Sequence, residues 1–136
     1  MLMKETRDIQ TQIKTHLSHD GQLTCAAAHH IATELKVEPL AVGEEATAMG
    51  IRITRCQLGF FGFAERKGLP GYKIVQELEQ VPGAAAGAVC RAAEGGKTTC
   101  AALWEIGKAH KLSKLDMGNI SQTMEIKTHS CQLGCF

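Results

Sequence analysis

The chain has 136 residues, a formal net charge of +1 at pH 7 and a hydrophobic fraction of 44%, values typical of a soluble globular protein. The near-neutral charge argues against tight, non-specific binding to nucleic acid, which requires clustered Lys and Arg. The sequence shows no apolar run long enough for a membrane span and no signal-peptide core at its start. We therefore expect a cytoplasmic protein with no membrane partner.

The first part of the chain predicts three helices and then a strand. Apolar residues recur at helical spacing in residues 3–18, 25–36 and 40–49, and they alternate with polar residues in residues 51–56. Thr24 stands where it can cap the second helix. Pro39 suits the first turn of the third helix, because its fixed φ angle is helical and it needs no N–H partner there.

The middle of the chain predicts a connection with one more helix. Residues 64–71 read AERKGLPG, which indicates an exposed linker or a hairpin loop. Residues 72–80 place Ile74, Val75 and Leu78 at helical spacing, which predicts a short helix. The alanine-rich stretch that follows predicts another helix, whose small side chains would allow close packing.

The sequence contains a long internal repeat. Residues 23–61 align with residues 98–136 without a gap, at an offset of 75, and both copies contain the runs TCAA and CQLG at matching positions. A repeat of fixed period indicates one structural unit built twice. We therefore predict two small domains, at residues 1–63 and 81–136, joined by a linker at residues 64–80.

The spacing of small and apolar residues in each copy resembles the signature of the winged helix-turn-helix superfamily. A small residue on the first helix lets the second helix cross closely, and apolar residues after the turn lock the pair. In the first copy these residues are Ile31, Ala32, Leu35, Val37, Leu40 and Val42, and in the second copy Gly107, Leu112, Leu115 and Met117 stand at matching places. The resemblance implies a mostly α fold with short β ribbons, built as two tandem winged helix-turn-helix-like repeats.

The same resemblance implies a small DNA-binding, transcription-regulating protein and not an enzyme. Residues 114–124, the second helix of the second copy, would enter a major groove of double-stranded DNA, and two repeats or a homodimer would supply the second half-site. Lysines and arginines would reach phosphates and amides would reach base edges. The candidate nucleic-acid-binding residues are Lys111, Lys114, Asn119, Gln122, Lys127, Arg52 and Arg55. The matching helix of the first copy carries Glu44 and Glu45 and no basic residue, so it would repel phosphates.

Two other functions stay open at this point. The acidic helix of the first copy and the near-neutral charge also suit a protein-interaction or dimerisation module. The repeated cysteines also suit a thiol or metal sensor, although buried cysteine often packs simply as a small apolar residue. The candidates for that role are Cys25, Cys56, Cys100, Cys131 and Cys135. We expect no cofactor, because the sequence has no phosphate-binding glycine loop, nucleophile elbow or HExxH motif.

Overall fold

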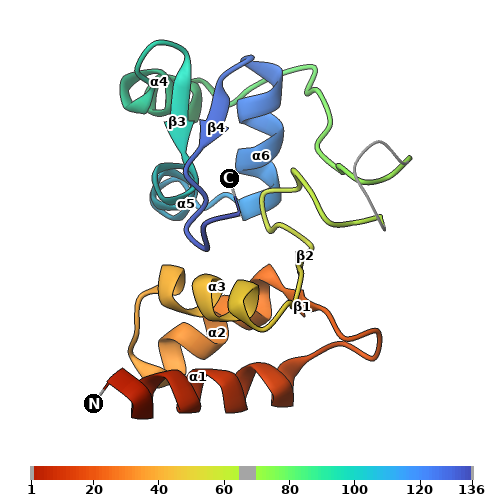
Figure 1. Cartoon of the computed structure of the whole chain (residues 1–136). Helices are drawn as coiled ribbons and strands as arrows, with labels where there is room; N and C mark the ends of the chain where they lie inside the picture. The colour runs from red at the N-terminus through yellow and green to blue at the C-terminus, as the bar shows by residue number, and fades with distance from the viewer. Residues whose placement is uncertain (1, 65–69, 136) are drawn as a thin grey trace. The chain divides into compact units, whose positions relative to one another are not determined.

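In the part of the chain that the structure describes, the fold is mostly helical with four very short strands (Figure 1). The computed structural model describes residues 2–64 and 70–135, with side chains from residue 7 onward. In chain order the described elements are α1 (Leu2–His16), β1 (Leu23–Thr24), α2 (Cys25–Leu35), α3 (Pro39–Ala48), β2 (Ile53–Thr54), α4 (Gly83–Ala92), β3 (Lys97–Thr99), α5 (Cys100–Ala109), α6 (Lys114–Thr123) and β4 (Lys127–His129). The mostly α class predicted from the sequence is confirmed. None of the described helices combines the length and the apolar composition that a bilayer crossing requires.

The strands form two parallel pairs. Leu23 and Thr24 of β1 lie opposite Ile53 and Thr54 of β2, and β3 pairs with β4 in the same way. Parallel neighbours need a crossover connection, and here a helix pair supplies it, α2 and α3 in the first copy and α5 and α6 in the second. Each ribbon is therefore a parallel pair closed by two helices, not a hairpin.

The strand predicted at residues 51–56 is much shorter in the structure, where only Ile53 and Thr54 pair. Arg55 ends it, because its φ of 53° is a left-handed conformation that leaves the extended path. Ser130, the matching residue after β4, has a φ of 58°. Left-handed conformations recur at the sequence offset in five pairs: Gly21 and Gly96, Lys36 and Lys111, Gly50 and Glu125, Arg55 and Ser130, and Gly59 and Gly134.

The helix starts follow from local side-chain chemistry. Thr24 Oγ1 accepts a hydrogen bond of 3.1 Å from the Ala27 N–H, so the predicted cap of α2 is confirmed, and Thr99 caps α5 with the same geometry. The α6 helix begins with a capping box between Ser113 and Asp116, which satisfies two N–H groups reciprocally. In α3 the predicted proline occupies the first turn instead.

The helices α1–α3 and the helices α4–α6 each bury an apolar core of their own. Ile13, Ile31 and Val42 are fully buried in the first set of helices, where α1 packs on both α2 and α3. Val89, Leu103, Met117 and Ile120 are buried in the second set, where α4 covers α5. Burying an aliphatic side chain of this size stabilises the fold by about 1.5–3 kcal/mol.

The prediction of a helix at residues 72–80 is wrong, because the structure has no helix there. This segment has no regular secondary structure and runs as an open, non-helical trace (Figure 1). Its N–H groups donate to other parts of the chain and not to the preceding turn: Ile74 donates to the Gly59 carbonyl at 2.9 Å, and Gln76 and Leu78 donate to side chains of α6. Most of the loop predicted at residues 64–71 lies outside the described residues.

The boundaries of the two compact units in the structure differ from the boundaries of the two sequence repeats. One unit contains residues 1–56 and 132–135, and the other contains residues 57–131. The Gln-Leu-Gly segment that follows the last strand of each copy therefore belongs to the unit built by the other copy. The predicted boundary at residue 63 does not follow this division, because it keeps each copy's own segment.

The exchanged segments make the same contact in both units. A Cβ atom on Gly43 of α3 would lie 1.9 Å from the Leu133 carbonyl oxygen, and one on Gly118 of α6 would lie 1.7 Å from the Leu58 carbonyl oxygen. Only glycine allows a backbone to approach a helix this closely. Leu58 and Leu133 are themselves 1% and 3% exposed. The shared glycine and the CQLG run of the repeat thus form one packing element.

Candidate functional site

Most of the side chains predicted to face DNA lie on the surface. Lys111, Gln122 and Lys127 are exposed in the second unit, and Arg52 and Arg55 are exposed in the first. The Lys114 ammonium lies 4.4 Å from the centre of the Trp104 ring, a cation–π contact that holds this half-buried lysine against its own helix pair.

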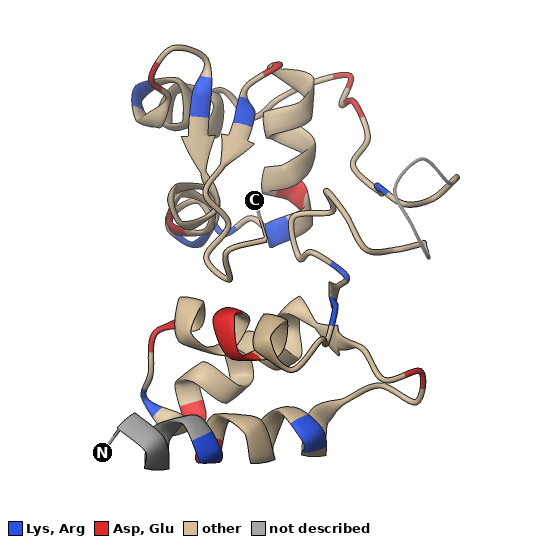
Figure 2. Ribbon diagram, in the orientation of Figure 1, with Lys and Arg blue, Asp and Glu red and all other residues tan. Residues whose placement is uncertain are grey.

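The strand register adds a basic position that the sequence did not single out. Lys97 of β3 lies directly opposite Lys127 of β4, and Figure 2 shows one basic position on each of these two strands. The signal was available in the repeat, because Lys97 immediately precedes the second copy, but only the parallel pairing brings the two lysines together.

Asn119 has a different environment from the one predicted. Its Oδ1 atom accepts a hydrogen bond of 2.8 Å from the Gln76 N–H. One turn further along α6, Thr123 Oγ1 accepts a hydrogen bond of 2.8 Å from the Leu78 N–H, while it donates to the Asn119 carbonyl at 2.7 Å. Two side chains of α6 therefore bind the main chain of the extended segment at residues 74–78, which we call the strap.

The spacing of these two hydrogen bonds follows from helix and strand geometry. Residues four apart on a helix lie on one face and about 6 Å apart along the axis. Residues two apart on an extended chain are about 6.6–6.8 Å apart and direct their N–H groups to the same side. The spacing of Asn119 and Thr123 on the helix thus matches the spacing of the Gln76 and Leu78 N–H groups.

The strap also places an aliphatic side chain between two glycines. The Cγ1 atom of Val75 lies 3.1 Å from the Cβ position that a side chain on Gly118 would occupy, and equally 3.1 Å from that on Gly59. Leu115 Cδ1 approaches the same position on Gly59 to 2.8 Å. Because Gly59 and Gly118 have no side chains, they leave a slot beside Leu115, and the Val75 side chain occupies it. Gly59 is buried beneath it.

These contacts leave little of α6 open. Met117, Gly118, Ile120 and Ser121 are buried in the unit, and Asn119 and Thr123 are half-buried beside the strap. The exposed residues of the helix are Leu115, Asp116 and Gln122. A recognition helix needs a continuous polar face to enter a groove, and in this conformation α6 presents only part of one.

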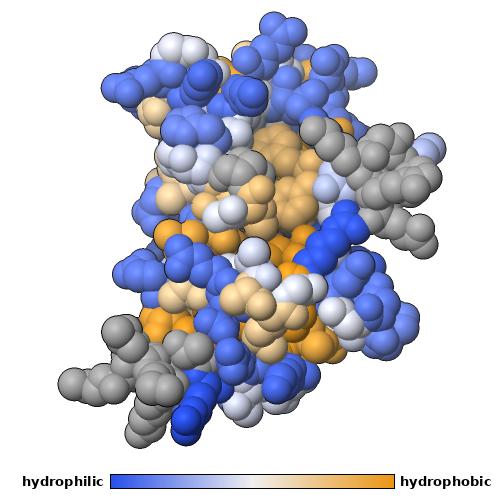
Figure 3. All heavy atoms as spheres, in the orientation of Figure 1, coloured by the Kyte–Doolittle hydropathy of each residue, from blue (hydrophilic) through white to orange (hydrophobic). Residues whose placement is uncertain are grey.

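The matching surface on α3 is more open. Leu40, Glu44 and Ala48 occupy the positions of Leu115, Asn119 and Thr123 at the offset of 75, and all three are exposed. Leu40 is 46% exposed, the largest value among the exposed large apolar residues of the described chain. Figure 3 shows that apolar atoms reach the surface among polar ones on the face that it presents.

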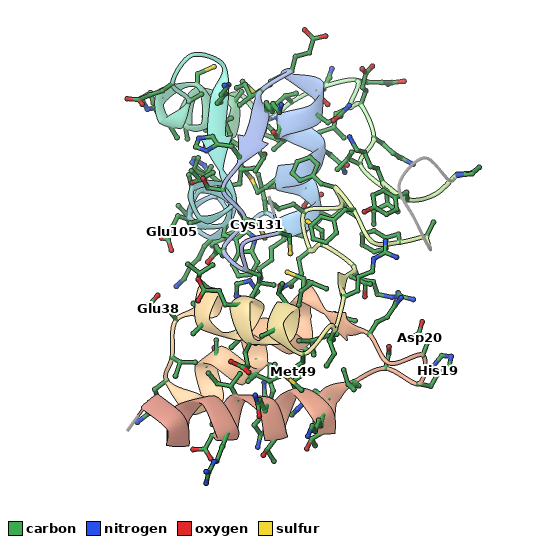
Figure 4. All side chains as sticks on the ribbon, viewed as in Figure 1. His19, Asp20, Glu38, Met49, Glu105 and Cys131 are labelled. Carbon is green, nitrogen blue, oxygen red and sulfur yellow. The ribbon has the colours of Figure 1, made fainter. Side chains whose placement is uncertain are left out.

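Three of the six cysteines are buried. Cys25, Cys56 and Cys100 are each 5% exposed. Cys131, which follows β4 and is labelled in Figure 4, is half-buried, and Cys90 and Cys135 are exposed. Among the described side chains, in residues 7–64 and 70–135, no three His, Cys, Asp or Glu residues gather in a way that could hold a metal ion. Burial of Cys25, Cys56 and Cys100 is usual for cysteine, which is among the residues most often found inside proteins.

Comparison with known proteins leaves the geometry as the basis for a functional argument. No protein-family model matches the chain, and no curated protein and no solved structure matches it either. The feature with the most direct chemical meaning is the set of acceptors and the glycine slot that hold the strap on α6.

Proposed function

We propose that the protein is a protein-interaction module whose helix pairs bind extended polypeptide segments along the outer face of the second helix. The observation that carries the proposal is the pair of hydrogen bonds from Gln76 and Leu78 to Asn119 and Thr123. Main-chain hydrogen bonds give affinity for an extended segment, and a pocket for one side chain gives selectivity. In this protein the slot that holds Val75 would give selectivity for the side chain that enters it. In this proposal the protein binds and does not catalyse.

The cover over α6 favours this function over DNA binding. For α6 to enter a major groove, the strap would have to leave Asn119 and Thr123, and the backbone at Leu58 would have to leave Gly118. The exposed part of α6 contains one carboxylate, on Asp116, which phosphates would repel. A partner segment would also have to displace the strap, but it could then use the same two acceptors and the same slot.

Binding of the strap in trans tests the proposal. Val75→Asp would put a carboxylate into the slot and displace the strap, because a charge in an apolar slot is strongly unfavourable. A fluorescent peptide with the sequence of residues 72–80 should then bind this variant saturably in an anisotropy titration. The unaltered protein should bind it less tightly, since its own strap competes at an effective concentration in the millimolar range.

Thr123→Val in the displaced variant locates the binding. It removes the hydroxyl that accepts from the Leu78 N–H, so we expect the affinity for the peptide to fall about fivefold. If the displaced variant keeps the α6 helix by NMR but does not bind the peptide, the proposed function is wrong.

DNA binding stays a second candidate because of the exposed basic side chains. Lys111, Lys127 and Lys97 are exposed in one unit together with the Gln122 amide. Duplex DNA in a low-salt gel shift tests this function: binding should weaken steeply as salt rises, and Lys127→Ala should reduce the salt slope by about one. A dimer that offers two half-sites, and a cytoplasmic location, stay predictions of the same hypothesis.

A further inference from the structure

The two copies differ at the place where the strap lies. Gly59 is buried, whereas Gly134, its counterpart at the offset of 75, is exposed. Asn119 and Thr123 are half-buried, whereas their counterparts Glu44 and Ala48 are exposed. Apart from the neighbours of Gly134 in the chain, Leu40 Cδ1 is the one described atom within 4 Å of where its Cβ would be. The described residues thus include no counterpart of the strap on α3.

The framework of the slot is nevertheless built in both units. The Leu133 backbone approaches Gly43 as the Leu58 backbone approaches Gly118, at 1.9 and 1.7 Å from the respective Cβ positions. Leu40 Cδ1 lies 2.9 Å from the Cβ position that a side chain on Gly134 would occupy, as Leu115 Cδ1 lies 2.8 Å from that on Gly59. Gly43, Gly134 and Leu40 thus border the surface on α3 in the same arrangement as their counterparts on α6. In the second unit those counterparts, Gly118, Gly59 and Leu115, surround the aliphatic strap.

We propose that the α3 surface formed by Leu40, Gly43, Glu44 and Gly134 binds an extended, aliphatic and basic segment of a partner protein. The inference rests on the proposed function and assigns the open site and the chemistry of its ligand. A β-branched residue enters the slot beside Gly134, as Val75 does beside Gly59. The neighbouring N–H of the partner donates to the Glu44 carboxylate, which stands at the position of Asn119.

The basic character of the partner follows from the charges around the slot. The α3 helix, PLAVGEEATA, contains two glutamates and no basic residue, and Figure 2 shows acidic positions on it and no basic one. Glu45 accepts a hydrogen bond of 2.5 Å from Gln10 of α1, so Glu44 is the carboxylate that faces a ligand. Ala48 offers no hydroxyl in place of Thr123. A Lys or Arg of the partner beside Glu44 would form a charge-assisted hydrogen bond, roughly twice as strong as a neutral one.

A synthetic peptide tests the site in the whole chain. The probe has the sequence of residues 72–80 with E77K and E79K, which keeps the aliphatic residues of the strap and makes the peptide basic. Titrated into the ¹⁵N-labelled protein, it should shift the amide signals of residues 40–48 and of Gly134 saturably. The peptide with the unaltered sequence, which keeps both glutamates, should bind at least about tenfold more weakly at this surface because Glu44 repels it.

Variants of the protein identify the contacts. Leu40→Asp should abolish these shifts, and Glu44→Gln, which keeps the shape of the side chain and removes its charge, should weaken the affinity for the basic peptide about tenfold. Glu94→Gln is the matched control, because Glu94 is an exposed glutamate of the other unit and its substitution should leave the affinity unchanged. Glu44 is exposed, so its variant tests the site even where Leu40→Asp perturbs the helix.

The outcomes separate this inference from the proposed function. If the displaced variant binds the strap peptide at α6 but the basic peptide shifts no signal on α3, the α3 site is wrong and the proposed function stands. If neither surface binds its peptide, both are wrong. If the protein alone sediments as a dimer that Leu40→Asp dissociates, a second copy covers the α3 surface and the peptide site is overturned.

Discussion

Gly43 and Gly118 each have a hydrogen atom where other residues have a Cβ atom, and this allows a leucine backbone to pack directly against the helix. Each glycine lies in the middle of a helix, where glycine is normally unfavourable by about 1 kcal/mol relative to alanine. At both positions, however, a Cβ atom would overlap a leucine carbonyl oxygen, at 1.9 and 1.7 Å. The intrinsic cost of glycine is therefore offset by the close approach of a backbone that no other residue would allow.

We expect Gly43→Ala and Gly118→Ala each to lower the free energy of unfolding by about 1–3 kcal/mol, because the carbonyl must move away from the helix. Urea unfolding followed by circular dichroism measures the change. Gly87→Ala in α4 is the matched control: the nearest atom to its Cβ position is the end of the flexible Arg91 side chain, at 3.3 Å, so this variant should be stabilised by about 0.5–1 kcal/mol. Equal effects at the three positions would contradict the packing argument.

A second residue-scale effect concerns the loop after α1, where Figure 4 shows His19 and Asp20 side by side in the chain. The Ser18 hydroxyl donates a hydrogen bond to the Asp20 carboxylate and, together with weaker contributions, holds the pKa of Asp20 below its ordinary value of 3.8. Because the folded pKa is the lower one, this contribution to stability is present above pH 3.8 and is lost as the pH falls through the folded pKa.

Ser18→Ala should therefore raise the pKa of Asp20 toward 3.8, since the donor that stabilises the charged carboxylate is gone. NMR titration of the Asp20 side-chain carboxyl carbon measures it. Ser18→Thr keeps the hydroxyl and should keep the pKa low. A pKa that stays low in Ser18→Ala would mean that His19 or the backbone, and not Ser18, is the main cause.

At the scale of elements, the strap shows why apolar spacing misleads in short segments. Ile74, Val75 and Leu78 fit one face of a helix, but the same residues can also be buried unevenly along an extended chain. An isolated helix of this length is marginal in water. Here the N–H groups of Ile74, Gln76 and Leu78 have acceptors on Gly59 and α6, which a helical strap could not reach.

Thr123→Val should loosen the strap locally. The variant keeps the shape of the side chain but removes the acceptor for the Leu78 N–H, so that amide should exchange with solvent about fivefold faster, equivalent to about 1 kcal/mol. Hydrogen exchange by NMR measures it residue by residue. Thr47→Val in α3 is the control, because the Thr47 hydroxyl donates to the Gly43 carbonyl of its own helix. Unchanged protection of Leu78 would show that the hydroxyl does not hold the strap.

At the scale of the whole molecule, the exchange of the Gln-Leu-Gly segments links the two copies. Residues 132–135 belong to the unit of α1, α2 and α3, although they end the second copy, and Leu58 belongs to the unit of α4, α5 and α6. A small domain buries a limited core, and each unit here includes a leucine contributed by the other copy. Neither copy alone contains all the residues of a compact unit.

A substitution in one copy should consequently destabilise helices of the other. Leu133→Ala should speed amide exchange in α1–α3 more than in α4–α6, and Leu58→Ala should do the reverse. Each variant should cost about 2–5 kcal/mol, because both side chains are buried. Hydrogen exchange of all the helices in one spectrum compares the two units directly. Faster exchange confined to the helices of the substituted copy would contradict the exchange of segments.

Local information in the sequence was sufficient for α1, α2 and α3, but it failed for residues 72–80, where the predicted helix does not form. The caps at Thr24 and Pro39 and the apolar spacing of α1, α2 and α3 are short-range signals, and the helices form where these signals predict them. The sequence also identified the repeat, because identity at a fixed offset needs no structure. Among the predicted site residues, it placed Lys111, Gln122 and Lys127 on the surface, since charged and amide side chains rarely bury.

Only the tertiary structure decided the rest, because it depends on contacts between residues far apart in the chain. The parallel pairing of β1 with β2 joins residues that the helices α2 and α3 separate in the sequence. The acceptors for the strap, Asn119 and Thr123, lie more than forty residues after the N–H groups that they bind. No local pattern encodes such a partner. Gly43 and Gly118 stand at matching positions of the repeat, as the two CQLG runs do, but only the fold determined that each glycine receives the segment of the opposite copy.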